Sequence, residues 1–189
     1  LDVCAAPGGK STLLSSYFSN GLVVSNEVIK PRAAVLVENI CKWGTNNVVV
    51  TNNDPKDFAA LKGFFDAIVV DAPCSGSGMF RKDTTAINEW SWNNVDLCSS
   101  RQQRIVADVL DALKEDGFLV YSTCSYSKEE NEDVVDWLVS TFQLTSIALD
   151  IEQNFGIVET QSDVTNAVGY RLDPYNVEGE GFFVAVLQK

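Results

Sequence analysis

The stretch Asp2-Val-Cys-Ala-Ala-Pro-Gly-Gly-Lys-Ser11 decides the fold of this chain. It leaves an apolar run, turns through two glycines and continues with helical spacing. Glycine lets the backbone approach a ligand closely, and a helix that starts there offers free N–H groups. The spacing is not GxGxxG, nor that of a P-loop, because Cys4 stands where the first P-loop glycine belongs. Taken alone, the stretch also fits a tight strand–helix turn that binds nothing.

Short apolar runs alternate with segments of helical spacing along the rest of the chain. The predicted strands are 21–26, 47–51, 66–71 and 118–123, and the predicted helices are 10–18, 31–42, 96–113 and 128–139. Nearly continuous apolar strands are typical of parallel strands that are covered on both faces. This alternation predicts an α/β fold with an open, doubly wound sheet.

The end of the chain follows another pattern. Residues 143–149 and 181–187 are predicted to pair as antiparallel strands at the sheet edge, joined by a loop-like insertion over 152–178. Residues 75–94 follow a strand with weak periodicity, so we expect a loop over the site. Acidic residues crowd the first half of helix 128–139, where the helix dipole favours them: Glu129, Glu130, Glu132 and Asp133.

Length and composition indicate one globular domain. The chain has 189 residues, 46% of them hydrophobic, and no apolar run near the roughly 20 residues of a membrane helix. It begins with Leu1, so we expect 1–189 to be an N-terminally truncated domain. A net charge of −12 argues against a nucleic-acid-binding face. With five scattered cysteines and no histidine, we expect no metal site and a reducing, cytoplasmic compartment.

Acidic residues follow three of the predicted strands. Residues 1–4 are predicted to be the end of a first strand. Glu27 directly follows the second strand, 21–26, roughly 20 residues after the glycine turn, where an acid can bind ribose hydroxyls. Asp54 follows the third strand, 47–51, and Asp71 ends the fourth, 66–71. Ligands bind at the carboxyl edge of such sheets, so these residues and the glycine turn predict one cofactor site.

Two of the cysteines stand among polar turn residues after neighbouring strands. Cys74 lies in Asp71-Ala-Pro-Cys-Ser-Gly76, and Cys124 lies in Ser122-Thr-Cys-Ser125. Free cysteine is common inside proteins, and that explanation suits Cys4, Cys41 and Cys98. It suits the other two poorly, so we expect them to face one pocket.

Five stretches of the chain are similar to the NOL1/NOP2/Sun-domain family of RNA 5-methylcytosine methyltransferases. They are DVCAAPGGKS, the pair Asn26–Glu27, VVDAPCSGSGMFRKD, LVYSTCSYSKEENEDVV and GEGFFVAVLQK. The resemblance is to bacterial ribosomal RNA members. It implies a Rossmann-like class I methyltransferase with a seven-stranded, mostly parallel sheet whose last strand is antiparallel. It also implies S-adenosylmethionine as cofactor, held by Cys4, Ala5, Ala6, Pro7, Gly8, Gly9, Lys10, Glu27, Asp54 and Asp71.

The implied chemistry accounts for the residue types. A thiolate that adds to carbon 6 of cytosine makes carbon 5 nucleophilic enough to accept a methyl group. The resemblance implies that Cys124 is this nucleophile, that Cys74 assists release, that Asp71 serves N3 and that Lys10 tunes these groups. From the residues alone, Cys74 could equally be the nucleophile. The cytosine has to leave its stack to reach such a pocket.

Departures and alternatives accompany the resemblance. The family usually has a histidine after the proline of its C-terminal segment, where this chain has Tyr175. We expect any basic RNA-binding surface to lie mainly on segments outside the chain. The alternative functions are the same chemistry on tRNA, transfer to protein, a scaffold without catalysis, and a nucleotide hydrolase that the incomplete P-loop disfavours.

Overall fold

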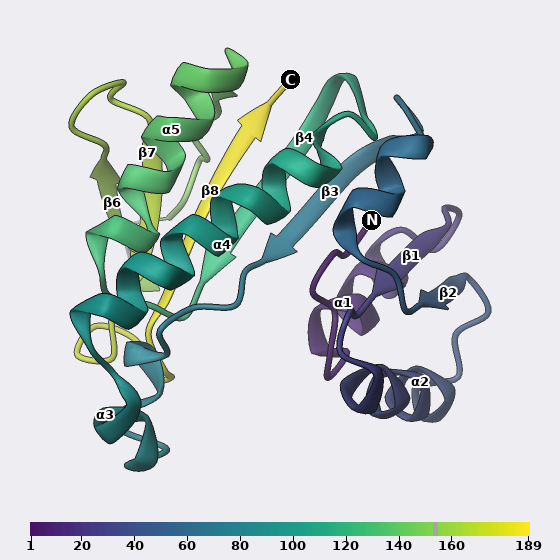
Figure 1. Ribbon diagram of the computed structural model, residues 1–189, viewed down its shortest axis with the longest axis horizontal. Coiled ribbons are helices and arrows are strands. Elements are labelled where there is room, and N and C mark those ends of the chain that lie inside the picture. The colour runs from purple at the N-terminus through teal and green to yellow at the C-terminus, as the bar shows by residue number, and fades with distance from the viewer. Residues whose placement is uncertain (153–154) are drawn as a thin grey trace.

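The computed structural model describes residues 1–152 and 155–189, which form a twisted sheet with helices packed on it (Figure 1). The strands lie in the order β2 (Val48–Thr51), β1 (Val23–Asn26), β3 (Phe65–Asp71), β4 (Leu113–Thr123), β8 (Phe182–Gln188), β7 (Val168–Leu172) and β6 (Val158–Gln161). Asp2 joins the two parts, because it bridges Ser25 of β1 and Val69 of β3 in parallel. Residues at the start of the chain thus stand where the first predicted strand was expected.

The direction of the strands follows the prediction. β1 and β2 are parallel, as are β3 and β4, whereas β8 runs antiparallel to β4. The short β5 (Thr145–Ser146) pairs antiparallel with β8 and therefore runs parallel to β4. The antiparallel last strand is confirmed.

One segment departs from the prediction. β6 and β7 form an antiparallel hairpin, and β7 also pairs with β8, so 158–172 is not the predicted loop. The hairpin adds two strands, whereas the expected first strand is only the bridge at Asp2, so the described residues form eight strands where seven were expected. Its strands have four and five residues and mixed polarity, which leaves little periodic signal. Residues 153–154 of the predicted insertion lie outside the described residues.

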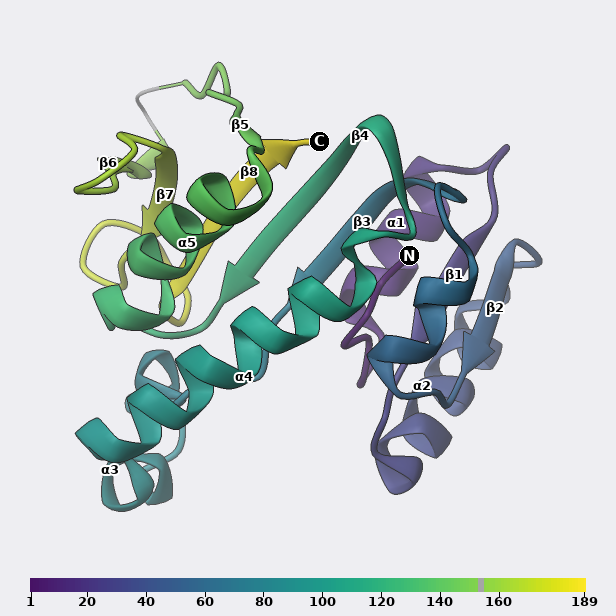
Figure 2. The same cartoon turned by 45° about the horizontal axis from the view of Figure 1, so that its top comes forward.

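The helices lie close to their predicted places. α1 (Gly9–Tyr17) packs against β1, and α2 (Lys30–Trp43) packs against β2. α4 (Trp92–Leu110) and α5 (Glu132–Phe142) lie side by side across the β3–β4–β8 part of the sheet (Figures 1 and 2). The side chain of Ser91 accepts a hydrogen bond from the Asn94 N–H, so α4 begins four residues before the predicted start.

The predicted loop over 75–94 contains two short helices. They are the 3-10 helix η2 (Ser77–Met79) and α3 (Thr85–Glu89), which extends from the body of the molecule below α4 (Figure 1). Two further 3-10 helices are η1 (Pro55–Ala60) and η3 (Lys128–Glu130), the latter standing where the predicted helix 128–139 begins.

The core lies between the sheet and the α4–α5 layer. Alternate residues of β8 are fully buried, as a strand with one covered face requires: Phe183, Ala185 and Leu187. Val106 and Val109 of α4 and Leu138 of α5 pack against them in the same cluster. This rigid layer fixes the carboxyl ends of β3 and β4. None of the helices within the described residues has the length and apolar character needed to cross a membrane.

Candidate active site

A cavity of about 480 Å³ opens at the carboxyl ends of the parallel strands, a size typical of small-molecule sites. Seven of the predicted site residues line it: Cys4, Ala6, Glu27, Asp54, Asp71, Cys74 and Cys124. They follow five different segments of the sheet, as expected when parallel strands end at one edge. The structure therefore brings these seven of the predicted residues to one place.

The glycine turn lies beside this cavity and contributes few residues to its wall. Gly8 has a φ of 114°, and a Cβ there would lie 3.1 Å from the Leu36 side chain, so the turn requires glycine. Ala5 is buried in an apolar cluster with Leu36. Pro7, Gly8 and Gly9 line a neighbouring hollow and not the cavity. Of this turn, only Cys4 and Ala6 lie in the cavity wall.

Glu27 provides the strongest structural evidence that this cavity binds a cofactor. Its side chain is 3% exposed, and Oε1 accepts a hydrogen bond of 2.9 Å from the Ile29 N–H. Oε2 has no hydrogen-bond partner among the described residues and lies 3.4 Å from Arg32 Nη1. A buried carboxylate oxygen without a partner is costly, and a ribose hydroxyl would supply the missing donor. The site therefore fits S-adenosylmethionine.

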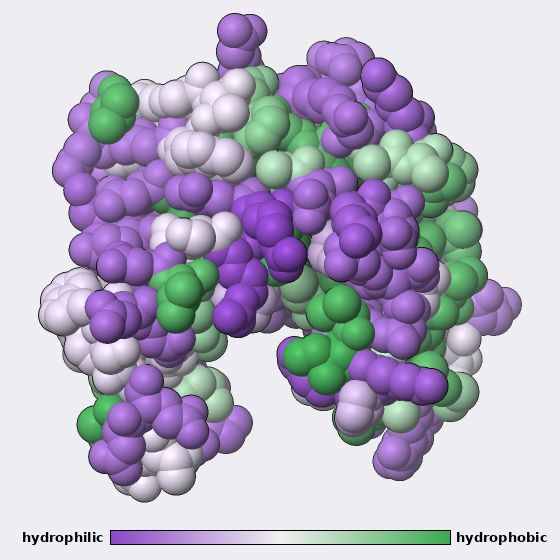
Figure 3. All heavy atoms as spheres, viewed as in Figure 1, coloured by the Kyte–Doolittle hydropathy of each residue, from purple (hydrophilic) through white to green (hydrophobic). Residues whose placement is uncertain are grey.

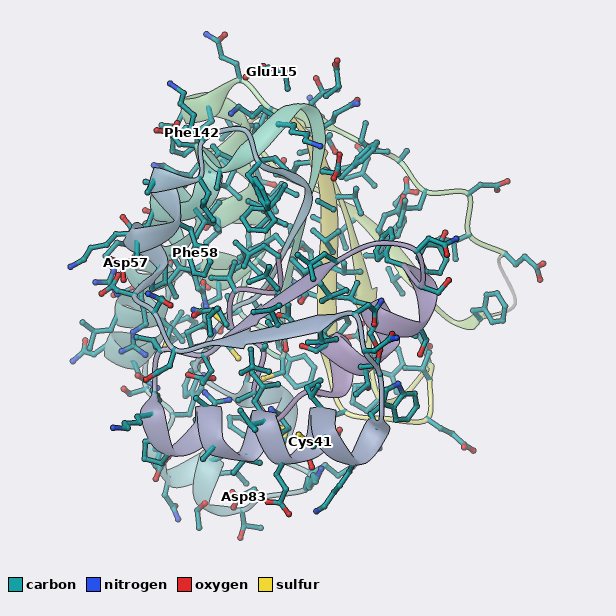
Figure 4. The ribbon with its side chains drawn as sticks, turned by 90° about the vertical axis from the view of Figure 1, so that its right-hand side faces the viewer. Cys41, Asp57, Phe58, Asp83, Glu115 and Phe142 are labelled. Atoms are coloured by element: carbon teal, nitrogen blue, oxygen red, sulfur yellow. The ribbon has the colours of Figure 1, made fainter. Side chains whose placement is uncertain are left out.

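Asp54 has a second role that the sequence did not reveal. Its Oδ1 accepts a hydrogen bond of 3.2 Å from the Lys56 N–H and so caps η1. Pro55 follows it in the cavity wall. Phe58 of the same helix points toward the core and Asp57 toward solvent (Figure 4). Capping by Asp54 thus orders the segment that closes this side of the cavity.

The two predicted cysteines face each other, with Cys74 Sγ 2.9 Å from Cys124 Sγ. The hydrogen bond that the two thiols share, together with burial, raises the pKa of Cys74. The same hydrogen bond lowers the pKa of Cys124, which is the less buried of the two. The remaining cysteines lie elsewhere or stay protonated. Burial raises the pKa of Cys4 to about 12, Cys41 is exposed on α2 (Figure 4), and Cys98 is buried.

Asp71 lies between the cofactor side and the cysteines. Lys10 Nζ is 2.7 Å from Asp71 Oδ2, and the Ser122 hydroxyl donates to Asp71 Oδ1 at 2.9 Å. Lys10 also lies over the Phe182 ring, 4.9 Å from its centroid. The carboxylate is thereby held in one orientation beside an ammonium group. No group of three or more His, Cys, Asp or Glu side chains within the described residues could hold a metal ion.

The segment after Cys74 packs directly on the turn of Cys124. The Gly78 N–H donates to the Cys124 carbonyl at 2.7 Å, and the Tyr126 N–H donates to Ser77 Oγ at 2.8 Å. A Cβ on Gly78 would collide with the carbonyl oxygens of Cys124 and Gly181. Glycine is required here because two backbones meet.

Two acidic residues near the site were missed as site components. Glu130 was assigned only to the acidic first half of a predicted helix, but its side chain is completely buried beneath the cysteine turns. Asp2 is 1% exposed and accepts a hydrogen bond from Ser11, and burial raises its pKa to about 6. Acid-rich composition does not distinguish a buried carboxylate from a solvated one, so the sequence alone carried no clear signal.

Comparisons with known proteins agree with this geometry. A family model described as 16S rRNA methyltransferase RsmB/F matches residues 1–188. Ribosomal RNA small subunit methyltransferase F of Psychromonas ingrahamii is 40% identical over 191 residues, and its relative from Klebsiella pneumoniae is 40% identical over 193. Each alignment covers all of this chain but only 39% and 40% of those proteins, so the chain spans about two fifths of their length.

Solved structures give the same result. NSun6 from Pyrococcus horikoshii, crystallised with the S-adenosylmethionine analogue SFG, superposes with a TM-score of 0.84 at 27% identity, over all of this chain and 47% of that one. A methyltransferase homologue from the same organism gives 0.78 at 31% identity, over all of this chain and 60% of that one. The family resemblance, the class I fold and the cofactor are thereby confirmed, whereas the roles of single residues stay predictions. The chain belongs to the 16S rRNA methyltransferase RsmB/F family of S-adenosylmethionine-dependent enzymes.

Proposed function

We propose that residues 1–189 are the catalytic domain of a methyltransferase that modifies carbon 5 of a cytosine in small-subunit ribosomal RNA. The observation that carries this proposal is the pair of thiols 2.9 Å apart, next to Asp71 and to a cavity that fits the cofactor. Methylation of an exocyclic nitrogen or a ribose oxygen needs no thiol nucleophile, whereas carbon 5 of cytosine does, because it is a poor nucleophile on its own. The names of the relatives support small-subunit ribosomal RNA as the substrate class.

The residues of the chain divide the work as follows. Glu27 would hold the cofactor ribose, and Asp54 and Pro55 would border its base. When bound, S-adenosylmethionine supplies the methyl group that carbon 5 receives. The Cys124 thiolate would bond to carbon 6, which moves an electron pair toward carbon 5 and the N3 side of the ring.

Asp71 and Lys10 would balance the charge that this addition creates. Asp71 would donate a proton to N3 as negative charge develops there, and the Lys10 ammonium, 2.7 Å from Asp71 Oδ2, would stabilise the carboxylate that remains until the proton returns on release. Cys74 would then help to remove the carbon 5 proton, so that the bond from Cys124 to carbon 6 breaks and Cys124 leaves as a thiolate. At rest, the hydrogen bond to Cys124 and burial raise the pKa of Cys74. Once Cys124 is bonded to carbon 6 it is no longer a thiolate, so Cys74 would give its own proton to solvent and then accept the proton from carbon 5.

The positions of the unpaired cations within the described residues make an RNA substrate compatible with the net charge of −12. Five cations have no carboxylate within ion-pair distance in the described part of the chain: Lys30, Lys62, Arg81, Arg101 and Arg104. Arg101 and Arg104, one turn apart on α4, line the cavity, and Arg81 lies in a neighbouring hollow with Tyr126 and Tyr175. In Figure 3, strongly hydrophilic side chains gather over the middle of α4, above a hollow between the α3 and α2 regions. An RNA strand would meet cations and aromatic rings there.

Methyl transfer to defined RNAs tests the proposal. The full-length protein is incubated with labelled S-adenosylmethionine and either 16S rRNA, small ribosomal subunits, tRNA or protein, and the product nucleoside is identified by mass spectrometry. We expect 5-methylcytidine in the ribosomal samples. Label confined to tRNA or protein, or a methylated nucleoside other than 5-methylcytidine, would contradict it.

A further inference from the structure

Each of the two cysteines is followed by a serine, and the two serines meet at one carboxylate. Glu130 Oε1 accepts a hydrogen bond of 2.8 Å from the Ser75 N–H. Its Oε2 accepts hydrogen bonds from the hydroxyls of Ser75 at 2.5 Å and Ser125 at 2.6 Å. One side chain of η3 therefore binds the turn that carries Cys74 and the turn that carries Cys124.

Burial of a carboxylate at position 130 is energetically unfavourable. It is fully buried, and no cation lies within ion-pair distance of it among the residues described. All of its partners are neutral donors, the fourth being Gln102 Nε2 at 2.9 Å. Burying a carboxylate costs several kcal/mol, and an apolar side chain of similar volume is often neutral or stabilising. Stability of the fold alone therefore gives no reason for an acid here.

The charge of Glu130 also works against the thiols that lie next to it. Two acids act on Cys124, Asp71 from β3 and Glu130 from η3, and both disfavour a second negative charge. The cations of the site are Lys10 of α1, which pairs with Asp71, and three arginines that line the same cavity, Arg32 of α2 and Arg101 and Arg104 of α4. The hydrogen bond with Cys74 acts in the opposite direction to the two acids and has the larger effect on the pKa of Cys124. This hydrogen bond therefore lowers the pKa of Cys124 by more than the two carboxylates raise it, and this depends on the short distance between the thiols.

We propose that Glu130 is a positioning residue, which locks the Cys74–Ser75 and Cys124–Ser125 turns together so that the two thiols stay within hydrogen-bond distance. Asn131 assists on one side, because its amide donates to the Ser125 carbonyl at 2.8 Å. The inference rests on the proposed function, since it assigns a role to the same two cysteines. It differs from a purely structural role in predicting that thiol chemistry changes with Glu130.

Glu132 provides a matched control. It is also buried, stands two residues further along, and is held by Arg171 and Thr160. It has no hydrogen bond to Ser75 or Ser125 in the described structure. Glu130→Gln and Glu132→Gln each remove one buried negative charge, but only Glu130 bonds directly to the serines of the two cysteine turns.

The experiment measures the pH dependence of Cys124 alkylation by iodoacetamide in the full-length protein, read at the level of the peptide by mass spectrometry. Removal of the Glu130 charge alone would move the alkylation midpoint to lower pH. Loss of the Cys74 hydrogen bond would move it to higher pH. We expect the shift to higher pH in Glu130→Gln and no shift in Glu132→Gln. We also expect kcat to fall about tenfold to hundredfold in Glu130→Gln, since small misplacements at a reacting centre have that effect.

A milder variant keeps the test decisive if Glu130→Gln does not fold. Ser125→Ala removes one donor and should shift the midpoint in the same direction by a smaller amount. A midpoint that stays in place or moves to lower pH in both variants would overturn the inference. Alkylation needs no RNA, so failure to methylate any RNA would count against the proposed function and leave this result standing.

Discussion

Replacement of Glu27 by glutamine should weaken S-adenosylmethionine binding without weakening the protein itself. Oε2 is buried and has no hydrogen-bond donor among the described residues, and the half-exposed Arg32 at 3.4 Å offsets only part of the desolvation cost of the acid. Glutamine keeps the size and leaves an oxygen for the Ile29 N–H, but it places a neutral NH2 where Oε2 was.

The magnitude follows from the bonds that ribose would make. A hydrogen bond to a charged acceptor contributes about 1.5–3 kcal/mol. Loss of one such bond corresponds to about a 10- to 150-fold weaker Kd, since about 1.4 kcal/mol equals a factor of ten. Thermal stability without cofactor should stay unchanged or rise, and the stabilisation by added cofactor should shrink.

Isothermal titration calorimetry and thermal unfolding with and without S-adenosylmethionine provide the two readouts. Asp57→Asn is the control, because Asp57 is an exposed acid on η1 that does not line the cavity (Figure 4). Equal affinity, within about twofold, of Glu27→Gln and the parent protein would refute the assignment, because an oxygen that binds ribose cannot be replaced at no cost.

Three further outcomes follow from the structure. The double variant Arg101→Gln/Arg104→Gln should bind RNA with a weaker salt dependence: the slope of log Kobs against log salt concentration should fall by about 0.7 for each lost phosphate contact. The control double variant Lys62→Gln/Lys114→Gln, at the opposite edge of the sheet, should keep the slope of the parent protein. Gly78→Ala should destabilise by about 1–3 kcal/mol and abolish turnover because the new Cβ meets the Cys124 backbone, and retained turnover would contradict this packing. Burial raises the pKa of Asp2 from 3.8 to about 6, so its contribution to stability is full below pH 3.8 and is lost as the pH rises through 6. The Tm of the parent protein relative to that of Asp2→Asn should therefore fall across this pH range. A Tm difference that does not change with pH would contradict the raised pKa of Asp2.

Local periodicity was sufficient for the central part of the fold. β3 is predicted as 66–71 and found as Phe65–Asp71, because a run buried on both faces has an unmistakable apolar pattern. The β6–β7 hairpin was missed because its register depends on pairing with β8, which is a tertiary contact. The early start of α4 depends on the Ser91 cap, a signal that was present in the sequence but overlooked.

The residues of the candidate site also fall into two groups, those with a local sequence signal and those defined only by tertiary contacts. Glu27, Asp71 and the two cysteines were found because each directly follows a recognisable strand, and the ends of parallel strands meet. Glu130 was missed because its four donors come from three other segments of the chain. Its neighbours Glu129 and Asp133 are less buried and have the same local signature. Nothing within one helical turn separates the buried acid from the solvated ones.

Trapping the covalent complex between the full-length protein and its ribosomal RNA tests the central claim most directly. If Cys124 attacks carbon 6, Cys124→Ala should lose both methyl transfer and the denaturant-resistant protein–RNA band. If Cys74 assists release, Cys74→Ala should still attack, and that band should accumulate. A band that persists in Cys124→Ala and vanishes in Cys74→Ala would exchange the two roles, and methyl transfer that survives both substitutions would contradict cysteine catalysis.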